Sequence, residues 1–317
     1  MSEQVLETLV ADAGRALGDN GKLMGSATTR PRFELFSAPN SICSQKVRCV
    51  LAYHGIPYIS HSINLFKGES YLPEYVRLRM RGCDRLGPDL AIRHNGSSSA
   101  AAGCDPAVVP TLVDWEVNDV FVDSKRVSIY LDDLMPEETK LRPKALKERI
   151  DEQLSVVDHM PNYQMLMARD ASAETETKAD IGSHFSARKI VWCDDYLEQY
   201  ANDPTLVRAY TAKRAKEVTS VNDLFQPKAI DAAYERAEQA IIDLGHMLEK
   251  REGHWMFGDK PTMADIFWGI EILRVRNMKA AYFWENGRLP EVERFVALAE
   301  TMPAIRTGVL EWPGAEF

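Results

Sequence analysis

The 317-residue sequence has no apolar run long enough to span a bilayer, and its first residues lack the basic start and apolar centre of a secretory signal. It also lacks an excess of positive charge, since 38 lysines and arginines against 47 aspartates and glutamates give a net charge of −9. Nucleic acid and anionic membranes are therefore not expected partners. The five cysteines are an odd number without close-spaced pairs, which suits neither a zinc site nor a disulfide framework. We expect a cytoplasmic protein without a metal.

The most informative stretch runs from Arg32 to Gly55, where a short strand precedes a helix. Residues 33–36 alternate apolar with polar side chains, as a strand does. Asn40 or Ser41 can cap the following helix, because the side-chain oxygen of either residue accepts a backbone N–H. One face of that helix carries Val47, Val50, Leu51 and His54, which are spaced at i, i+3, i+4 and i+7.

Cys43 therefore falls in the first turn of this helix. The partial positive charge of a helix N-terminus favours a thiolate over a thiol, and Lys46 and Arg48 add positive charge nearby. The pattern predicts a reactive cysteine. A buried, unreactive cysteine is the commoner role of this residue type, and placement alone does not decide between the two roles.

The following segments continue an alternation of strands and helices, and Asp123 and Ser124 open the last helix of the series. The order β-α-β-α-β-β-α is thioredoxin-like, since parallel strands need helical crossovers whereas the last two strands need only a turn. We expect the polar stretch 79–107 to be an inserted loop, either functional or merely tolerated at the surface. The expected elements are a strand over 58–63, a short helix over 73–78, and a hairpin of strands over 108–113 and 120–122.

Residues 1–31 read as an N-terminal extension with one helix, packed on the domain or trailing from it. Beyond a linker at 136–143 the chain is helical, with a bundle seam over 230–248 and a polar loop over 170–180. Thr262 begins a further helix, and Asp265 three residues later can accept the N–H of the cap residue. This pair predicts a capping box.

These features resemble the glutathione S-transferases, in which the loop between the first strand and helix holds the sulfur of glutathione. The resemblance implies an α/β plus all-α fold, with an N-terminal thioredoxin-like glutathione-binding domain over 32–135 and an all-helical bundle over 144–317. It also implies glutathione as cosubstrate, a small aromatic electrophile as second substrate, and a homodimer.

The same resemblance implies roles for several residues. Val109 would pair through its backbone with the cysteinyl part of glutathione, next to Pro110 in the cis form, which an X-Pro bond adopts at small cost; an ordinary strand proline is the alternative. Asp123 and Ser124 resemble the acidic-Ser pair that holds the γ-glutamyl end, a role compatible with a simple N-cap. Lys67 resembles a basic position that contacts the glycyl carboxylate in some classes.

The stretches SICSQKVR, PEYVRLR, VVPTLVD and FGDKPTMADIFW and the closing EWPG resemble a narrower group, the glutathione-dependent reductive dechlorinases of chlorinated hydroquinones. This resemblance implies that glutathione displaces chloride from a tautomer of the ring. Cys43 would then attack the sulfur of the adduct to form a mixed disulfide, which a second glutathione would resolve. Ser41 would position or polarise the first thiol.

Two alternatives stay open. The protein is a glutathione transferase or glutathione-dependent ether-cleaving lyase if Ser41 or Cys43 only stabilises the glutathione thiolate. It is a non-catalytic binding protein if the fold has kept no activity. Candidates for the aromatic-substrate pocket, by position only, are Tyr163, His184, Phe185, Trp192 and Tyr196.

Overall fold

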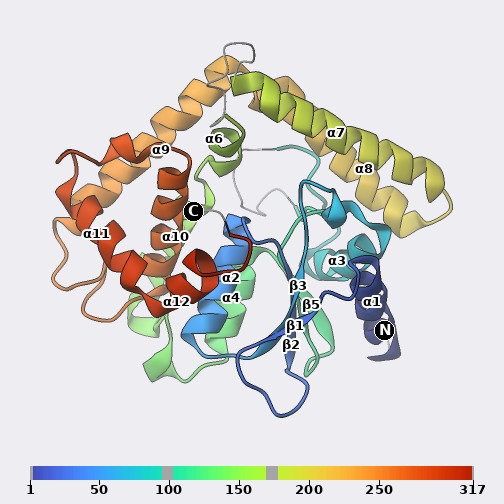
Figure 1. The fold of residues 1–317 in the computed structure, drawn as a ribbon, viewed down its shortest axis with the longest axis horizontal. Helices are drawn as coiled ribbons and strands as arrows, with labels where there is room; N and C mark the ends of the chain where they lie inside the picture. Colours follow the sequence, from blue (N-terminus) through green and yellow to red (C-terminus); the bar gives the residue numbers. More distant parts are fainter. Residues whose placement is uncertain (1–2, 95–102, 169–177, 316–317) are drawn as a thin grey trace.

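The computed structural model describes residues 3–94, 103–168 and 178–315. A five-stranded sheet in the order β1-β3-β2-β4-β5 forms the centre of the N-terminal half (Figure 1). β2 and β3 run parallel, and the other three strand pairs are antiparallel. The strands are β1 (Lys22–Met24), β2 (Phe33–Ser37), β3 (Tyr58–Ser62), β4 (Thr111–Asp114) and β5 (Asp119–Val122).

Helices cover both faces of this sheet, with α2 and α4 on one face and α1 and α3 on the other (Figure 1). Because successive side chains of a strand point to opposite faces, neighbouring residues of β2 enter different cores. Leu35 belongs to the core that includes α2 and α4, whereas Phe36 belongs to the core that includes α3. The helices of this half are α1 (Glu3–Ala16), α2 (Ile42–Tyr53), α3 (Pro73–Leu86) and α4 (Ser124–Asp133).

The predicted order β-α-β-α-β-β-α is confirmed from β2 to α4. The N-terminal extension contains the expected helix, α1, and also the strand β1, which pairs antiparallel with β3 at the edge of the sheet. Three residues are too few to show strand alternation in a sequence, so β1 was not predicted. The extension is therefore packed on the domain and does not trail from it.

The predicted short helix over 73–78 is wrong in its length, because α3 continues to Leu86. The predicted polar loop began at Arg79, a charged residue, but only 3% of the surface of Arg79 is exposed. Its guanidinium is satisfied by backbone carbonyls and the Thr111 hydroxyl, so the helix face turned toward the sheet continues past it. The insertion therefore begins at Gly87, and most of its polar segment, 95–102, lies outside the described residues.

The C-terminal half is helical, as predicted. α7 begins at Lys178, so the last residues of the expected loop over 170–180 are helical, and the remainder of that loop lies outside the described residues. The helices of the C-terminal half are α5 (Lys147–Asp158), α6 (Asn162–Ala168), α7 (Lys178–Gln199), α8 (Pro204–Thr219), α9 (Pro227–Leu248), α10 (Met263–Asn277), α11 (Pro290–Thr301) and α12 (Pro303–Ile305). Short 3-10 or π turns lie at Glu69–Tyr71, Glu137–Thr139, Lys144–Leu146, Ser220–Leu224, Ala281–Phe283 and Arg306–Leu310.

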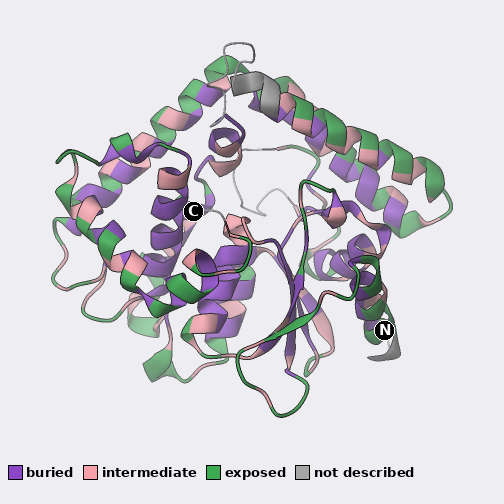
Figure 2. Cartoon of the chain, in the orientation of Figure 1, coloured by how far each residue is buried: buried purple, intermediate pink, exposed green. Residues whose placement is uncertain are grey.

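α10 is buried from Met263 to Val275 and packs against α2 (Figure 2). The predicted capping box at its start is confirmed, since Asp265 accepts hydrogen bonds from the Thr262 N–H at 2.7 Å and the Thr262 hydroxyl at 2.6 Å. Asp265 also accepts from the Met256 N–H at 2.8 Å, which ties the preceding turn to the helix. The capping box therefore supports the helix against which α2 rests.

The spacing of the cysteines did not indicate a disulfide, but Cys83 of α3 and Cys104 form one, with their Cα atoms 5.4 Å apart. These cysteines are 21 residues apart in the sequence, and only the return of the chain toward α3 brings them together. Cys43 is free and partly exposed, and Cys49 and Cys193 are free and buried.

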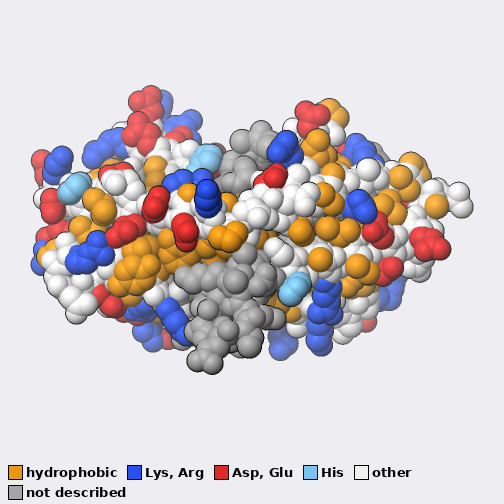
Figure 3. Space-filling view, turned by 90° about the horizontal axis from the view of Figure 1, so that it is seen from above, with side chains coloured by type: hydrophobic (Ala, Val, Ile, Leu, Met, Phe, Trp, Pro, Cys, Tyr) orange, Lys and Arg blue, Asp and Glu red, His pale blue; other side chains and the backbone are white. Residues whose placement is uncertain are grey.

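Within the described ranges, no helix is both long and apolar enough to cross a membrane. The described part of the chain likewise holds no group of three or more His, Cys, Asp or Glu side chains placed to bind a metal. Seen from above, positive and negative side chains are interspersed with apolar ones (Figure 3). This mixing of signs is typical of a surface that faces water.

Candidate active site

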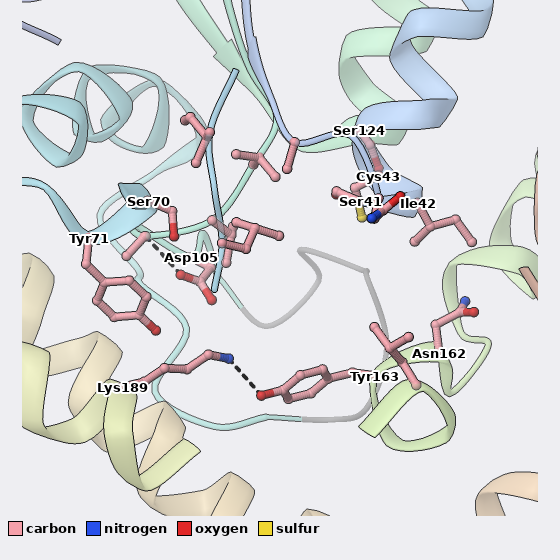
Figure 4. Close-up of a pocket in the computed structure, with 18 of the residues that line it drawn as sticks. Ser41, Ile42, Cys43, Ser70, Tyr71, Asp105, Ser124, Asn162, Tyr163 and Lys189 are labelled. Carbon is pink, nitrogen blue, oxygen red and sulfur yellow. Dashed lines mark hydrogen bonds between the residues drawn. The ribbon is translucent and has the colours of Figure 1, made fainter. Parts of the chain in front are cut away.

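A cavity of about 580 Å³ lies between the thioredoxin-like and helical halves (Figure 4). The N-terminal half lines it with the loop into α2, the loop after β3, the segment before β4 and the start of α4. The C-terminal half lines it with α6, α7 and α8. The cavity thus brings together these predicted site residues: Ser41, Cys43, Val109, Asp123 and Ser124.

Cys43 lies in the first turn of α2, as predicted, and its side chain lines the cavity (Figure 4). Ser41 is the N-cap of the helix, and its Oγ accepts a hydrogen bond from the Ser44 N–H at 3.3 Å. A hydroxyl has two lone pairs and one hydrogen, so this bond leaves the Ser41 hydrogen available to a thiolate in the cavity. Both the cysteine and a hydroxyl donor are therefore present at the helix start.

Buried polar side chains in the first two turns of α2 hold the loop that precedes the helix. Ser44 Oγ accepts from the Ala38 N–H at 3.2 Å, and the Arg48 guanidinium donates to Ala38 O at 2.9 Å and Pro39 O at 2.8 Å. Arg48 also donates to Gly308 O at 2.9 Å, which ties the C-terminal segment to α2. Arg48 is therefore a scaffold residue, and the prediction that it supplies charge beside the thiol is wrong.

Lys46 is buried as well, with Nζ 3.0 Å from Asp158 Oδ1 and 4.7 Å from the centroid of the Phe267 ring. Burial raises the pKa of the Cys43 thiol, and this effect outweighs the Lys46 charge and a hydrogen bond from Ser124, which both lower that pKa. The sequence predicted that the helix start would favour the thiolate, but burial shifts the pKa of Cys43 upward and so favours the thiol in the protein alone.

The Val109–Pro110 peptide bond is cis, as predicted, and Val109 lines the cavity. The buried guanidinium of Arg79, on α3, holds this loop from behind. It donates to Pro110 O at 2.6 Å, to Asp105 O at 2.7 Å and to Thr111 Oγ1 at 2.9 Å. Such a fork of donors fixes the backbone edge that faces the cavity.

Asp123 is the N-cap of α4 and accepts a hydrogen bond from the Arg126 N–H at 3.0 Å. Its backbone φ of 74° is uncommon for a residue other than glycine, and it directs the chain into the helix beside the cavity. Ser124 follows with its hydroxyl near the Cys43 thiol (Figure 4). Lys67 is exposed and outside the cavity lining, so its contact with a glycyl carboxylate stays a prediction.

Two of the five aromatic candidates, Tyr163 and Phe185, line the cavity. The other three lie outside its lining. Trp192 packs on Tyr71 with ring centroids 5.2 Å apart, Tyr196 stacks on Tyr210 at 5.1 Å, and His184 is exposed. Position in the sequence could not distinguish the four candidates on α7, because successive residues of a helix face different sides.

Five charged side chains that the sequence analysis did not identify also line the cavity, and we call them the charge series. Their order in space is Lys216, Asp105, Lys213, Glu217, Lys189. The successive N–O distances are 2.8, 2.8, 2.9 and 3.6 Å. None of the five side chains is more than 14% exposed.

The sequence did carry a signal for part of this series. Lys213 and Glu217 of α8 follow Leu206, Ala209 and Tyr210 at helical spacing, so they occupy the same buried face as these apolar residues. Lysine and glutamate are almost never fully buried unless they are paired. Charged residues on an apolar helix face therefore indicate a buried network or a binding site.

Residues 40–134 match the family of the glutathione S-transferase N-terminal domain. The chain is 33% identical over 304 residues to 2,5-dichlorohydroquinone reductive dechlorinase of Sphingobium indicum, and the match covers 92% of this chain and 86% of that protein. It is 30% identical over 124 residues to a zeta-class glutathione S-transferase of Euphorbia esula, with 39% of this chain and 43% of that one covered. The dechlorinase match extends over both halves of the fold.

Solved structures share the whole architecture at low sequence identity. The β-etherase LigF from Sphingobium sp. strain SYK-6 aligns with a TM-score of 0.57 at 14% identity, covering 89% of this chain and 100% of that one. Ure2p in complex with glutathione aligns with a TM-score of 0.57 at 15% identity, covering 89% and 94%. Both confirm the predicted thioredoxin-like domain followed by a helical domain.

Proposed function

The chain belongs to the glutathione S-transferase family of enzymes, and we propose that it is a glutathione-dependent reductive dehalogenase that acts on a chlorinated hydroquinone. The observation that carries this proposal is the position of Cys43, in the first turn of α2 and open to a cavity that it shares with Ser41, Ser124 and the cis-proline loop. Similarity over most of the chain to a dichlorohydroquinone dechlorinase supports the substrate class.

The proposed reaction uses two glutathione molecules. The thiolate of the first adds to a keto tautomer of the ring, and chloride leaves to give a glutathionyl adduct. Cys43 gives up its proton as its sulfur attacks the adduct sulfur. The carbon–sulfur bond breaks, the ring carbon takes up a proton, and a Cys43–glutathione disulfide forms. The second thiolate frees Cys43 and releases glutathione disulfide, so two thiols are oxidised while the ring gains two electrons.

The raised pKa of Cys43 suits this order of events. A thiol is a weak nucleophile, so Cys43 does not compete with glutathione for the electrophilic ring. The Ser41 hydroxyl, whose hydrogen is free to donate, stabilises the glutathione thiolate instead. The Val109 backbone, the pair Asp123 and Ser124, and Lys67 are the proposed contacts to the remainder of glutathione.

A second function, glutathione transfer or ether cleavage without a mixed disulfide, is favoured by the same two observations. If the thiol form of Cys43 prevails throughout, Ser41 alone suffices to hold a glutathione thiolate. The two functions differ in one step, the attack of Cys43 on the adduct.

The Cys43→Ser variant separates the two functions. We expect the variant, given glutathione and a chlorinated hydroquinone, to release one chloride per substrate molecule and to accumulate the glutathionyl conjugate. Mass spectrometry of the small molecules measures this conjugate. Full turnover to the dechlorinated ring by this variant would exclude the mixed disulfide. Cys193→Ser, at a buried free cysteine, is the matched control and should behave like wild type.

The intact protein mass gives a second, independent measurement. After exposure to glutathione disulfide, wild type and Cys193→Ser should each gain the mass of one glutathione, whereas Cys43→Ser should gain none. Modification of all three proteins to the same extent would contradict the exchange role of Cys43.

A further inference from the structure

The charge series in the cavity contains three lysines and two carboxylates. Asp105 lies between Lys216 and Lys213, and Glu217 lies between Lys213 and Lys189. Each carboxylate is therefore shared by two ammonium groups, and the series ends in a lysine on either side. With three cations for two anions, it carries one positive charge in excess, in a place largely shielded from water.

Lys189 is the least neutralised of the three lysines. Its Nζ lies 3.6 Å from Glu217 Oε2, whereas Lys213 and Lys216 each approach a carboxylate oxygen to 2.8 Å. Lys189 donates a hydrogen bond to the Tyr163 hydroxyl at 2.7 Å. An ammonium has three hydrogens, so these contacts with described residues leave it able to donate to a ligand oxygen.

The walls beside Lys189 are apolar and aromatic. Its Nζ lies 4.6 Å from the ring centroid of Tyr163 and 4.5 Å from that of Phe185. Phe66 packs on Phe185 with ring centroids 5.7 Å apart, and Leu166 and Met167 also line the cavity. An apolar space with aromatic walls that ends in a cation complements an aromatic ring that carries one anionic oxygen.

We propose that Lys189 and Tyr163 bind the ionised oxygen of the ring substrate, so that the enzyme takes a phenolate and not a neutral phenol. This proposal rests on the proposed function and names the anchor for its hydroquinone. Nζ and the hydroxyl oxygen lie 2.7 Å apart and so converge on a single oxygen, which suits a phenolate better than a two-oxygen carboxylate.

The position of the anchor also fits the proposed chemistry. Figure 4 shows Lys189 and Tyr163 across the cavity from Ser41 and Cys43. A ring held at its oxygen by the first pair therefore presents its carbon edge to the sulfur side. When a thiolate adds to the keto tautomer, negative charge develops on that ring oxygen, and donors already aimed at it stabilise the transition state.

Binding of 4-nitrophenol tests the anchor without any reaction, because the phenol and the phenolate absorb at different wavelengths. Wild type should bind the probe with the phenolate spectrum at a pH where the free probe is mostly protonated. Lys189→Met should bind it about 10- to 100-fold more weakly, the effect of losing a hydrogen bond to a charged group. The matched control Arg188→Met removes an exposed positive charge from the same helix and should bind like wild type.

Tyr163→Phe keeps the aromatic ring and the Lys189 charge and removes only the hydroxyl. It therefore tests the anchor even if Lys189→Met fails to fold. It should weaken binding about 3- to 10-fold and retain the phenolate spectrum. Binding of the neutral phenol by wild type, no binding by wild type, or equal affinity in wild type and Lys189→Met would each overturn the proposal.

Chloride release then separates this proposal from the function on which it rests. If wild type dechlorinates a chlorohydroquinone and Lys189→Met does so with unchanged kcat/KM, the anchor is wrong and the function stands. If the phenolate binds at Lys189 but wild type releases no chloride from any chlorohydroquinone, the dehalogenase function is wrong and the anchor stands.

Discussion

The Ser124 hydroxyl, at the first residue of α4, lies beside the Cys43 thiol in the first turn of α2 and lowers its pKa (Figure 4). The two helices pack side by side on one face of the sheet, and both start at the cavity (Figures 1 and 4). Two helix N-termini therefore direct partial positive charge toward one place. The site is suited to a sulfur anion that forms during the reaction, although the resting cysteine is a thiol.

Removal of this hydroxyl should make Cys43 a still weaker acid. The Ser124 hydroxyl lowers the pKa of Cys43 because it can donate to the thiolate, so Ser124→Ala should raise that pKa further and slow the alkylation of Cys43 by iodoacetamide at a fixed pH. Mass spectrometry of the modified protein measures the rate as a function of pH. Ser128→Ala removes from the same helix a buried hydroxyl that has no hydrogen-bond partner among the described residues, and its rates should match wild type. Identical rates in all three proteins would mean that Ser124 does not act on the thiol.

Lys46→Met should destabilise the fold by about 3 kcal/mol, because it removes the ammonium 3.0 Å from the buried Asp158 carboxylate, whereas Lys125 lies farther away at 3.5 Å. Urea unfolding measures the change. The double variant Lys46→Met with Asp158→Leu should recover most of the loss, since no buried charge is then unpaired. Lys67→Met, at an exposed lysine, is the control and should change stability by less than about 0.5 kcal/mol. If Lys46→Met alone is as stable as wild type, the ion pair between Lys46 and Asp158 contributes nothing to the free energy of unfolding.

Glu271 should make the stability of the protein depend on pH in the mildly acidic range. It is fully buried, and burial raises its pKa from 4.5 to about 7, against the opposing effects of Lys46 and a hydrogen bond from Asn162. The folded state therefore holds this proton more tightly than the unfolded state. The contribution to stability is fully present below about pH 4.5 and is lost as pH rises through about 7, by about 3 kcal/mol in total.

Urea unfolding of wild type and Glu271→Gln at pH 5 and pH 8 isolates this contribution. The neutral amide cannot ionise, so the variant should lose less stability than wild type between the two pH values. Glu252→Gln, at an exposed glutamate, should follow wild type. If Glu271→Gln has the same pH dependence as wild type, Glu271 is ionised in the folded protein at both pH values.

Asp265→Ala should lower the free energy of unfolding by about 2 kcal/mol. The change leaves the N–H groups of Thr262 and Met256 without their buried acceptor at the start of α10. Because α10 packs against α2, the loss should appear in global unfolding and not only in local fraying. Asp259→Ala, at an exposed aspartate shortly before the helix, is the control. Equal melting temperatures for Asp265→Ala and wild type would contradict this role.

The sequence by itself determined the elements whose signal is local. The helix start at Ser41 and Cys43, the hairpin that leads to Asp123, and the pair Thr262 and Asp265 depend on residues a few positions apart. A cap, a turn and an apolar periodicity are short-range effects of backbone hydrogen bonding and side-chain spacing, so they can be recognised without knowing the fold.

Only the tertiary structure decided what surrounds the thiol and the ring pocket. From its position in the sequence, Arg48 was predicted to add positive charge near Cys43. In the structure its guanidinium donates to Gly308 O, 260 residues away in the chain. Asp105 meets Lys213 across the interface of the two halves, and the pKa of Cys43 depends on how deeply α2 is covered. Burial and charge pairing are sums over neighbours that are distant in the chain, and these neighbours are set by packing and not by local sequence.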